Sequence, residues 1–582
     1  MQPPARGHPP NDPSRHGQSP RRYLDQVRGR PGLRSRARSP WYAPPPLRQV
    51  RSASGTQDGP HNRYRQRRRD RAGAGARRAH PARRHGQRQR QDEIARRVVV
   101  VAFDGLQPSQ VTPRLMPRLS AFADRGVRFT RHHAVFPSVT RLNAASMVTG
   151  CYPGTHGIAG NRFVFRDVDP DRPLDVLEPQ LRTVQARTRG RVLLVPTLAD
   201  ILARFGKDYV AVISGTSGNA YCHNPNASRL GGAVLHPDFT LPDDLARAIE
   251  ASYGRWPAEK VPNDLRVRHA TDLLIKYAIH ERNAAVAFVW YSEPDKSQHA
   301  HGVGAGVANG ALTAADAQFG RILDSIDGAG QRQTTDILVV SDHGYSTSLG
   351  KIDVVAAARA AGFPELPAAG GVAIAPNGGS FLCYFGSGDR ATADRFVAWC
   401  ATQQWCGALF LSPSLGKIEG TLPGDLLGID GPRGPDLAVS MAWDLVTPAG
   451  SEYAGRSYSA GDIGPGRGDH GSASPQEMRN ILIAAGPGFK SGFRSEMPSG
   501  NVDIAPTVLS LLGMDAEPMD GRVLTEALSE GRSPTPPGVV LKTYSASRVV
   551  EKVRYSQTAS IWEVGNTRYL DQAHASREAS GW

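Results

Sequence analysis

Aspartate and histidine residues stand at spacings that could bind metal ions. Asp295 and His299 are four residues apart, so in a helix both side chains would lie on one face and could bind one ion. Asp342 and His343 are adjacent at the end of an apolar run, where a turn can bring both to one metal. Carboxylates and imidazoles without thiolates favour zinc, with manganese or magnesium as weaker alternatives. Two further candidate ligands are Asp104, directly after the apolar run VVVVAF, and His470, in the segment GRGDHG.

A threonine in the segment FPSVTRLNAASMVTG, residues 136–150, could act as a nucleophile. Thr140 precedes a run of residues compatible with a helix, so we expect it to open that helix as its N-cap. Backbone N–H groups at a helix N-terminus point outward and favour anions such as phosphate. A threonine hydroxyl is a weak nucleophile by itself, but a divalent metal at its oxygen would lower its pKa and make attack possible.

Apolar runs and helical patterns alternate along the chain and must position these side chains. Continuous apolar runs predict strands buried on both faces, and the segments between them have helical periodicity. This alternation predicts an α/β fold, with a mostly parallel sheet covered by helices on both faces. Ligands bind at the carboxyl ends of such strands, where several of the candidate residues stand. The predicted strands are 98–103, 209–214, 285–291, 335–341, 436–443 and 480–485.

Three segments interrupt this pattern and are rich in Gly, Pro and Asp: 160–195, 215–262 and 365–435. We interpret them as insertions that shape a pocket or form a small cap. The end of the chain, residues 539–577, alternates apolar and polar residues, which favours a β-hairpin packed on the core. The predicted division is therefore a main domain over residues 98–531 and a C-terminal extension over residues 532–582.

The N-terminal 97 residues differ in composition from the rest. They contain 25 Arg, no Lys and only 6 acidic residues, whereas the remaining residues carry 45 basic and 48 acidic side chains. With 13 Pro and few large apolar residues, this tail cannot bury enough surface to offset its ordering entropy, so we expect it to be disordered. Because the folded part is near neutral, we expect no nucleic-acid binding beyond weak attraction of polyanions to the tail.

No apolar run is long enough for a membrane span, and the tail lacks the apolar core of a signal peptide. We therefore expect no membrane partner and a cytoplasmic location, unless an upstream start has been wrongly assigned. The five Cys have no regular spacing, which argues against a disulfide framework or a Cys-rich zinc site.

Taken in order, these segments resemble the nucleotide pyrophosphatase/phosphodiesterase family of the alkaline phosphatase superfamily. The resemblance spans about residues 98–531, and it is specific because the separated blocks follow the family's order. The matching segments are AFDG at 102–105, FPSVTRLNAASMVTGCYPGTHGIAGN at 136–161, YSEPDKSQHAHG at 291–302, SDHG at 341–344, GDHG at 468–471 and NVDIAPTVLSLLGM at 501–514.

The resemblance implies an alkaline-phosphatase-like fold, two divalent metal ions, most simply Zn2+, and a role for each matching residue. Thr140 would be the nucleophile, and Asn161 would bind a non-bridging oxygen of the phosphate. The implied substrates are small phosphorylated molecules, either nucleotide pyrophosphates or phosphodiesters, cleaved through a covalent phosphothreonine intermediate. The implied ligands are Asp295, His299 and His470 for one metal, and Asp104, Asp342 and His343 for the other.

One position departs from the family pattern and leaves the substrate class open. Arg141 follows the threonine where the family usually has an apolar residue. We expect its side chain to point outward, which would leave Asn161 as a neutral donor suited to singly charged diesters. Cleavage of a phosphonate C–P bond remains an alternative, because the phosphonoacetate hydrolase branch of the superfamily also has an Asn three residues after its Thr, as Asn143 is here. Phosphomonoester hydrolysis is another alternative within the superfamily. A polyanion-binding protein that acts through its basic tail is the alternative from another class.

Overall fold

The computed structural model describes residues 96–515, 518–529 and 538–579. The predicted disordered tail falls almost wholly outside these residues and stays a prediction. The first described strand, β1 (Arg97–Phe103), contains four consecutive valines, and all seven of its residues are buried. Alternate side chains of β1 contribute to two separate cores, with Val98 and Val100 in one and Val99 and Val101 in the other. The prediction of a strand buried on both faces is therefore confirmed.

A ten-stranded sheet forms the centre of the fold, and its order is β20-β2-β19-β9-β1-β8-β5-β6-β7, with β21 paired to β2. Strands β9, β1, β8, β5 and β6 are parallel, whereas β19 runs antiparallel to both β9 and β2. The prediction of a mostly parallel sheet is confirmed. The bounds besides β1 are β2 (Val127–His133), β5 (Tyr209–Ile213), β6 (Ala233–Leu235), β7 (Thr240–Leu241), β8 (Val286–Tyr291), β9 (Thr335–Val340), β19 (Arg479–Ala485), β20 (Phe493–Ser495) and β21 (Ser499–Gly500).

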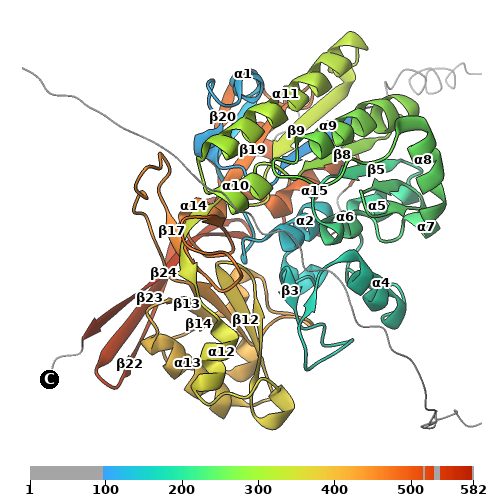
Figure 1. The fold of residues 1–582 in the computed structure, drawn as a ribbon. Helices are drawn as coiled ribbons and strands as arrows, with labels where there is room; N and C mark the ends of the chain where they lie inside the picture. The colour runs from blue at the N-terminus through green and yellow to red at the C-terminus, as the bar shows by residue number, and fades with distance from the viewer. Residues whose placement is uncertain (1–95, 516–517, 530–537, 580–582) are drawn as a thin grey trace, which may run out of the picture. The chain divides into compact units, whose positions relative to one another are not determined.

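Helices cover both faces of this sheet (Figure 1). One face carries α1 (Pro117–Arg125), α9 (Asp264–Leu273) and α11 (Gly306–Gly328), and α9 continues as a π-helix over Leu274–Glu281. The other face carries α2 (Thr140–Thr149), α5 (Leu198–Arg204), α6 (Ser217–His223) and α15 (Ile504–Leu511). The remaining helices are α3 (Pro153–His156), α4 (Glu178–Arg187), α7 (Ala227–Leu230), α8 (Ala246–Tyr253), α10 (Asp295–His301), α12 (Val354–Ala360), α13 (Arg390–Thr402) and α14 (Pro475–Met478).

The predicted insertion at 365–435 folds as part of a second sheet with its own core. Its strand order is β11-β12-β15-β13-β14, and α12 and α13 pack on it. The apolar run at 436–443, predicted as one more strand of the main sheet, lies here instead, because β15 pairs antiparallel with β12 and β13. The bounds are β11 (Val372–Pro376), β12 (Ser380–Phe385), β13 (Cys406–Leu411), β14 (Leu422–Pro423) and β15 (Leu437–Met441).

Two smaller sheets lie in the loops around the sheet edge. One pairs β3 (Arg162–Phe163) with β4 (Leu174–Asp175) inside the insertion at 160–195. The other has the order β16-β17-β10-β18. Its strands are β10 (Ser346–Lys351), β16 (Trp443–Asp444), β17 (Arg456–Ser459) and β18 (Gly468–Asp469).

The C-terminal extension contains one strand more than the predicted hairpin. Three long antiparallel strands follow one another, namely β22 (Val539–Val550), β23 (Val553–Val564) and β24 (Thr567–Ala579). Asp571 in β24 accepts hydrogen bonds from Nε and Nη2 of Arg479 at 2.9 and 2.8 Å, and it lies 3.1 Å from Nε2 of His133. These contacts attach the extension to strands β19 and β2 of the main sheet. The division at residue 531 stays a prediction, because residues 530–537 lie outside the described residues.

All five cysteines are free and buried. Within the described residues, no helix combines the length and apolar character needed to cross a membrane.

Candidate active site

The candidate metal ligands meet at the carboxyl ends of three neighbouring parallel strands. Asp104 directly follows β1, Asp295 opens α10 shortly after β8, and Asp342 and His343 follow β9. Because β8 and β9 flank β1 on either side, their ends lie side by side. His470 comes from the loop after β18, which pairs with β10 and reaches the same edge. The structure thus brings together all six residues predicted from the sequence.

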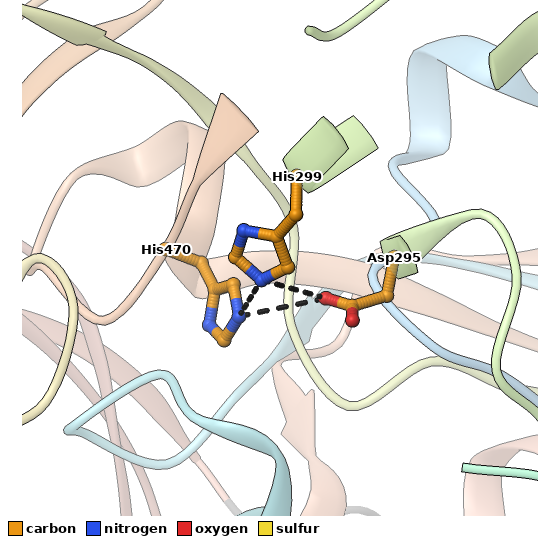
Figure 2. A group of neighbouring side chains, drawn as sticks. All are labelled: Asp295, His299 and His470. Atoms are coloured by element: carbon orange, nitrogen blue, oxygen red, sulfur yellow. Dashed lines mark hydrogen bonds and ion pairs between the residues drawn. The ribbon is translucent and has the colours of Figure 1, made fainter. Parts of the chain in front are cut away.

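Asp295, His299 and His470 form the first cluster, drawn in Figure 2. The Nε2 atoms of the two histidines lie 3.2 Å apart, and Oδ1 of Asp295 lies 3.3 Å from Nε2 of His299 and 3.5 Å from Nε2 of His470. Tetrahedral zinc ligands at about 2.1 Å from the ion are about 3.4 Å apart. The prediction of a helix that places Asp295 and His299 on one face is confirmed by α10, and the triangle has the size that one ion requires.

The tautomers of these histidines also suit a metal. Nδ1 of His299 donates to the carbonyl oxygen of Gly468 at 2.9 Å, and Nδ1 of His470 donates to that of Ser138 at 2.8 Å. A neutral imidazole with a proton on Nδ1 has its lone pair on Nε2, so two lone pairs face each other here. Such a pair repels unless a cation or a proton lies between. Burial lowers the pKa of His299, but the carboxylate of Asp295 outweighs burial and raises this pKa to about 9. Without a metal, a proton on Nε2 of His299 would therefore lie between the two nitrogens.

The second cluster surrounds Nε2 of His343. Oδ2 of Asp342 lies 3.0 Å from this nitrogen and Oδ1 of Asp104 lies 3.6 Å from it, while Nδ1 of His343 donates to the carbonyl oxygen of Gly344 at 3.0 Å. The ligand atoms of Asp104, Asp295 and His343 all lie within 4.8 Å of one another. Asp295 therefore adjoins both clusters, although the sequence pattern assigned it to one.

Each aspartate of the second cluster has one oxygen held by the protein and one without a hydrogen bond. Nε1 of Trp290 donates to Oδ2 of Asp104 at 2.9 Å, and the backbone N–H of Gly105 donates to Oδ1 of Asp342 at 3.0 Å. The other oxygens, Oδ1 of Asp104 and Oδ2 of Asp342, are buried and accept no hydrogen bond. Buried carboxylate oxygens are costly without a partner, so this donor set fits a divalent cation. Burial, together with the carboxylates of Asp342 and Asp295, raises the pKa of Asp104 well above its ordinary value.

Two aromatic residues that the sequence analysis did not single out orient these ligands. Trp290 is the residue before the last of β8, and its hydrogen bond to Oδ2 of Asp104 fixes that carboxylate. Tyr345 donates from its hydroxyl group to the carboxylate of Asp295. Gly105 has a φ of +70°, and a β-carbon there would lie 2.4 Å from the Tyr345 ring, which explains the glycine in AFDG. Both aromatic residues lie close to the matching motifs, but only the fold shows which carboxylate each one contacts.

Thr140 is the first residue of α2, and Val139 is the N-cap, so the predicted N-cap role of Thr140 is wrong by one position. Oγ1 of Thr140 lies 3.3 Å from Nε2 of His343. The hydroxyl group therefore adjoins the second cluster on the side of the two unpaired carboxylate oxygens. This is the position that a nucleophile activated by a cation in that cluster would need.

Asn161 contacts the first turn of α2, next to Thr140. Oδ1 of Asn161 accepts a hydrogen bond from the backbone N–H of Arg141 at 2.9 Å, and Nδ2 donates to no group of the described residues. The loop itself is held by Asn377, whose Oδ1 accepts from the N–H of Asn161 at 2.7 Å and of Arg162 at 3.1 Å. Asn377 lies in the turn between β11 and β12 of the second sheet, and no sequence signal pointed to it.

Arg141 points inward, so the expectation that it would turn outward is wrong. It is the one residue of α2 that is not fully buried, and its Nη1 donates to the carbonyl oxygen of Asn161 at 3.0 Å. The side chain lines a pocket of about 440 Å³ together with Asn161, His299 and His470. Asp175 and Asn377 also line this pocket, which confirms that the insertions at 160–195 and 365–435 shape it.

Known proteins resemble parts of this chain in sequence. The chain is 23% identical to bis(5'-adenosyl)-triphosphatase enpp4 of Xenopus laevis over 253 residues, which are 43% of this chain and 47% of the relative. It is also 40% identical to an ectonucleotide pyrophosphatase/phosphodiesterase of Caenorhabditis elegans over 68 residues, 12% of this chain and 9% of the relative. The chain thus spans about half the length of the first relative and much less of the second.

Solved structures extend this likeness to the fold. Murine ectonucleotide pyrophosphatase/phosphodiesterase 5, as an inactive threonine-to-alanine variant in complex with AMP, matches with a TM-score of 0.53 and 15% identity. The match covers 75% of this chain and all of the murine chain. Human ectonucleotide pyrophosphatase/phosphodiesterase 5 matches with a TM-score of 0.52 and 14% identity, over 75% of this chain and all of the human chain. This likeness confirms the alkaline-phosphatase-like α/β fold.

A family model covers the part of the chain that carries most of the site. The model is described as type I phosphodiesterase/nucleotide pyrophosphatase, and it matches residues 98–390, half of the chain. This range includes β1, β8 and β9 with the side chains that follow them. The chain therefore belongs to the type I phosphodiesterase/nucleotide pyrophosphatase family.

Proposed function

We propose that the protein is a metal-dependent hydrolase that cleaves phosphodiester or nucleotide pyrophosphate bonds, with Thr140 as its nucleophile. One observation carries the proposal. The Thr140 hydroxyl and two buried, unpaired carboxylate oxygens, from Asp104 and Asp342, converge on Nε2 of His343. The names of the relatives agree with it, since they describe pyrophosphatases, phosphodiesterases and a dinucleoside triphosphatase.

Two divalent ions fit the donor sets, and zinc suits them best because they combine carboxylate oxygens with imidazole nitrogens. One ion would be held by Asp295, His299 and His470. The other would be held by Asp104, Asp342 and His343, with Asp295 adjoining. Bound there, the ions would offset the charge of the phosphate and lower the pKa of the Thr140 hydroxyl group.

The residues of the chain then perform the phosphoryl transfer. The hydroxyl group of Thr140 gives up its proton to solvent, and its Oγ1 attacks phosphorus in line with the leaving oxygen. The bond from phosphorus to the leaving group breaks, the first product departs as an alcohol or a phosphate, and the phosphothreonine that forms still carries the other substituent of the substrate. Nδ2 of Asn161, which has no other acceptor, donates to a non-bridging oxygen whose charge grows in the transition state. Water then hydrolyses the phosphothreonine, which releases the second product as a phosphomonoester and restores the hydroxyl group of Thr140.

The experiment that tests this function offers four substrates to the purified protein with zinc: an aryl phosphodiester, an aryl phosphomonoester, a dinucleoside pyrophosphate and phosphonoacetate. We expect turnover of the diester or the pyrophosphate, and none with Thr140→Ala. Release of phosphate and acetate from phosphonoacetate alone would instead identify a C–P hydrolase. A protein inactive on all four substrates, while it binds two zinc ions, would overturn the proposal.

A further inference from the structure

Arg141 places a cation directly beside the proposed nucleophile. Two contacts hold it there: its backbone N–H donates to Oδ1 of Asn161 at 2.9 Å, and its Nη1 donates to the carbonyl oxygen of the same residue at 3.0 Å. Every other residue of α2 is buried, so the Arg141 side chain is where this helix meets the pocket. The guanidinium group and the proposed phosphate donor Asn161 therefore lie on the same side of Thr140.

The guanidinium group retains unused donors. Nε of Arg141 is buried without a hydrogen-bond partner, and the described residues place no carboxylate within 4.0 Å of the guanidinium group. The other cations that line the pocket are paired, Arg162 with Asp175 at 3.7 Å and Lys351 with Asp462. A buried, unpaired guanidinium donor is costly, and its planar set of N–H groups matches phosphate oxygens.

The charge of the substrate decides what this cation can bind. A simple phosphodiester carries one negative charge, which Asn161 and the proposed ions already meet. An additional guanidinium group contributes most when a second negative charge lies within reach. On the basis of the proposed function, we propose that Arg141 determines specificity by binding a second negative charge of the substrate. That charge is carried either by the scissile phosphoryl group itself or by a phosphate directly attached to it.

Two matched pairs of substrates test this role. Bis(p-nitrophenyl) phosphate and p-nitrophenyl phosphate share the leaving group and differ by one charge on the scissile phosphate. The p-nitrophenyl ester of AMP and diadenosine 5',5'-diphosphate share the adenylyl group that is transferred, and the second has AMP, with its additional phosphate charge, as the leaving group in place of p-nitrophenol. The kcat/KM values of wild type, Arg141→Ala, Arg141→Lys and Arg162→Ala are measured on all four substrates. Metal content and melting temperature are measured for each variant.

We expect Arg141→Ala to lose about 10- to 100-fold more kcat/KM on the doubly charged member of one pair than on its match, as for the loss of a charged hydrogen bond. The pair of substrates in which the two losses differ shows whether the second charge is on the scissile phosphoryl group or on the attached phosphate. Arg141→Lys should recover part of this preference, and Arg162→Ala should change both members of each pair by one common factor.

Equal losses on both members of each pair, or a larger loss on the singly charged ones, would overturn the role of Arg141 and leave the proposed function intact. Wild-type protein that is inactive on all four substrates would overturn the proposed function and this role with it. If Arg141→Ala fails to fold, Arg141→Gln decides, because it keeps a polar side chain without the charge, and a preference for the doubly charged substrate that is unchanged in that variant would overturn the role of Arg141.

Discussion

The backbone N–H of Asp295 donates a hydrogen bond to the backbone carbonyl oxygen of Asp104 at 3.1 Å. This bond joins the segment after β8 to the segment after β1, and each segment carries a ligand of a different cluster. Oδ1 of Asp295 also lies near Nε2 of both His299 and His470, so Asp295 connects the two clusters. The spacing between the two proposed ions is therefore built into the main chain at the edge of the sheet.

The first prediction concerns the metals. The protein should bind two divalent ions per chain, and His299→Ala should lose one of them because it removes one of three ligands. Metal analysis after dialysis checks this, with His280→Ala, an exposed histidine, as the matched control. Chelation should abolish activity, and zinc should restore it best. Active protein without any bound transition metal would contradict the assignment.

The second prediction concerns the nucleophile. Thr140→Ala should lower kcat by more than about 1,000-fold, because no other hydroxyl group replaces the attacking oxygen. Thr140→Ser should keep part of the activity. Mass spectrometry of wild type quenched in acid during turnover should find, on the peptide that contains Thr140, one phosphoryl group that still carries the substituent retained from the substrate. Both variants should bind metal as wild type does, so an Ala variant that keeps full activity would rule out the covalent route.

The third prediction concerns Asn161. Asn161→Ala should lower kcat about 10- to 1,000-fold, as for the loss of one preorganised donor to a developing negative charge. Asn377→Ala should act through Asn161, because Asn377 only holds the backbone of that loop. We therefore expect a smaller loss for Asn377→Ala, and almost none when it is added to Asn161→Ala. Additive losses in this double-mutant cycle would show that the two residues act separately.

The fourth prediction concerns the pH dependence of stability. Burial raises the pKa of the Asp503 carboxyl group from 3.8 to about 6, although Arg522 and two backbone N–H groups act in the opposite direction. Between these values the native state retains a proton that the unfolded chain has released. The contribution of this group to stability is therefore present below about pH 4 and decreases as the pH rises toward 6.

Comparison with Asp503→Asn, which cannot titrate, isolates this effect. The free energy of unfolding of wild type minus that of the variant should fall by at most about 3 kcal/mol between pH 4 and pH 6.5. Urea unfolding at several pH values measures the difference. Asp244→Asn, at an exposed aspartate, is the control and should give a flat difference. A difference that rises with pH would show that Asp503 ionises more easily in the folded protein.

The fifth prediction concerns the C-terminal sheet. Asp571 is 6% exposed and accepts two hydrogen bonds from Arg479. Asp571→Asn should lower the free energy of unfolding by about 1–3 kcal/mol, because it weakens charged hydrogen bonds at a buried contact. Glu578→Gln, at an exposed position of the same strand, should change stability little. Equal stability of the two variants would mean that Asp571 does not anchor the extension.

The sequence by itself determined the central strands of the main sheet and several of the side chains at its edge. The valine run of β1 and the similar runs of β8 and β9 are buried on both faces, a pattern that is visible without any distant contact. Parallel strands then bring their carboxyl ends together, which predicted that Asp104, Asp295, Asp342 and His343 lie at one edge. The complete set of six candidate ligands and the role of Thr140 followed from the resemblance to the family. The four-residue spacing of Asp295 and His299 needed only the geometry of one helix.

Only the tertiary structure decided how these residues are shared and what surrounds them. Asp295 adjoins both clusters, Asn377 reaches the site from a second sheet, and Arg141 turns into the pocket. Each of these facts depends on contacts between segments that are far apart in the chain, and no local period or spacing encodes such contacts. All other residues of α2 are buried, so the side chain of Arg141 can extend only into the pocket. On an exposed helix the same side chain could have turned to solvent.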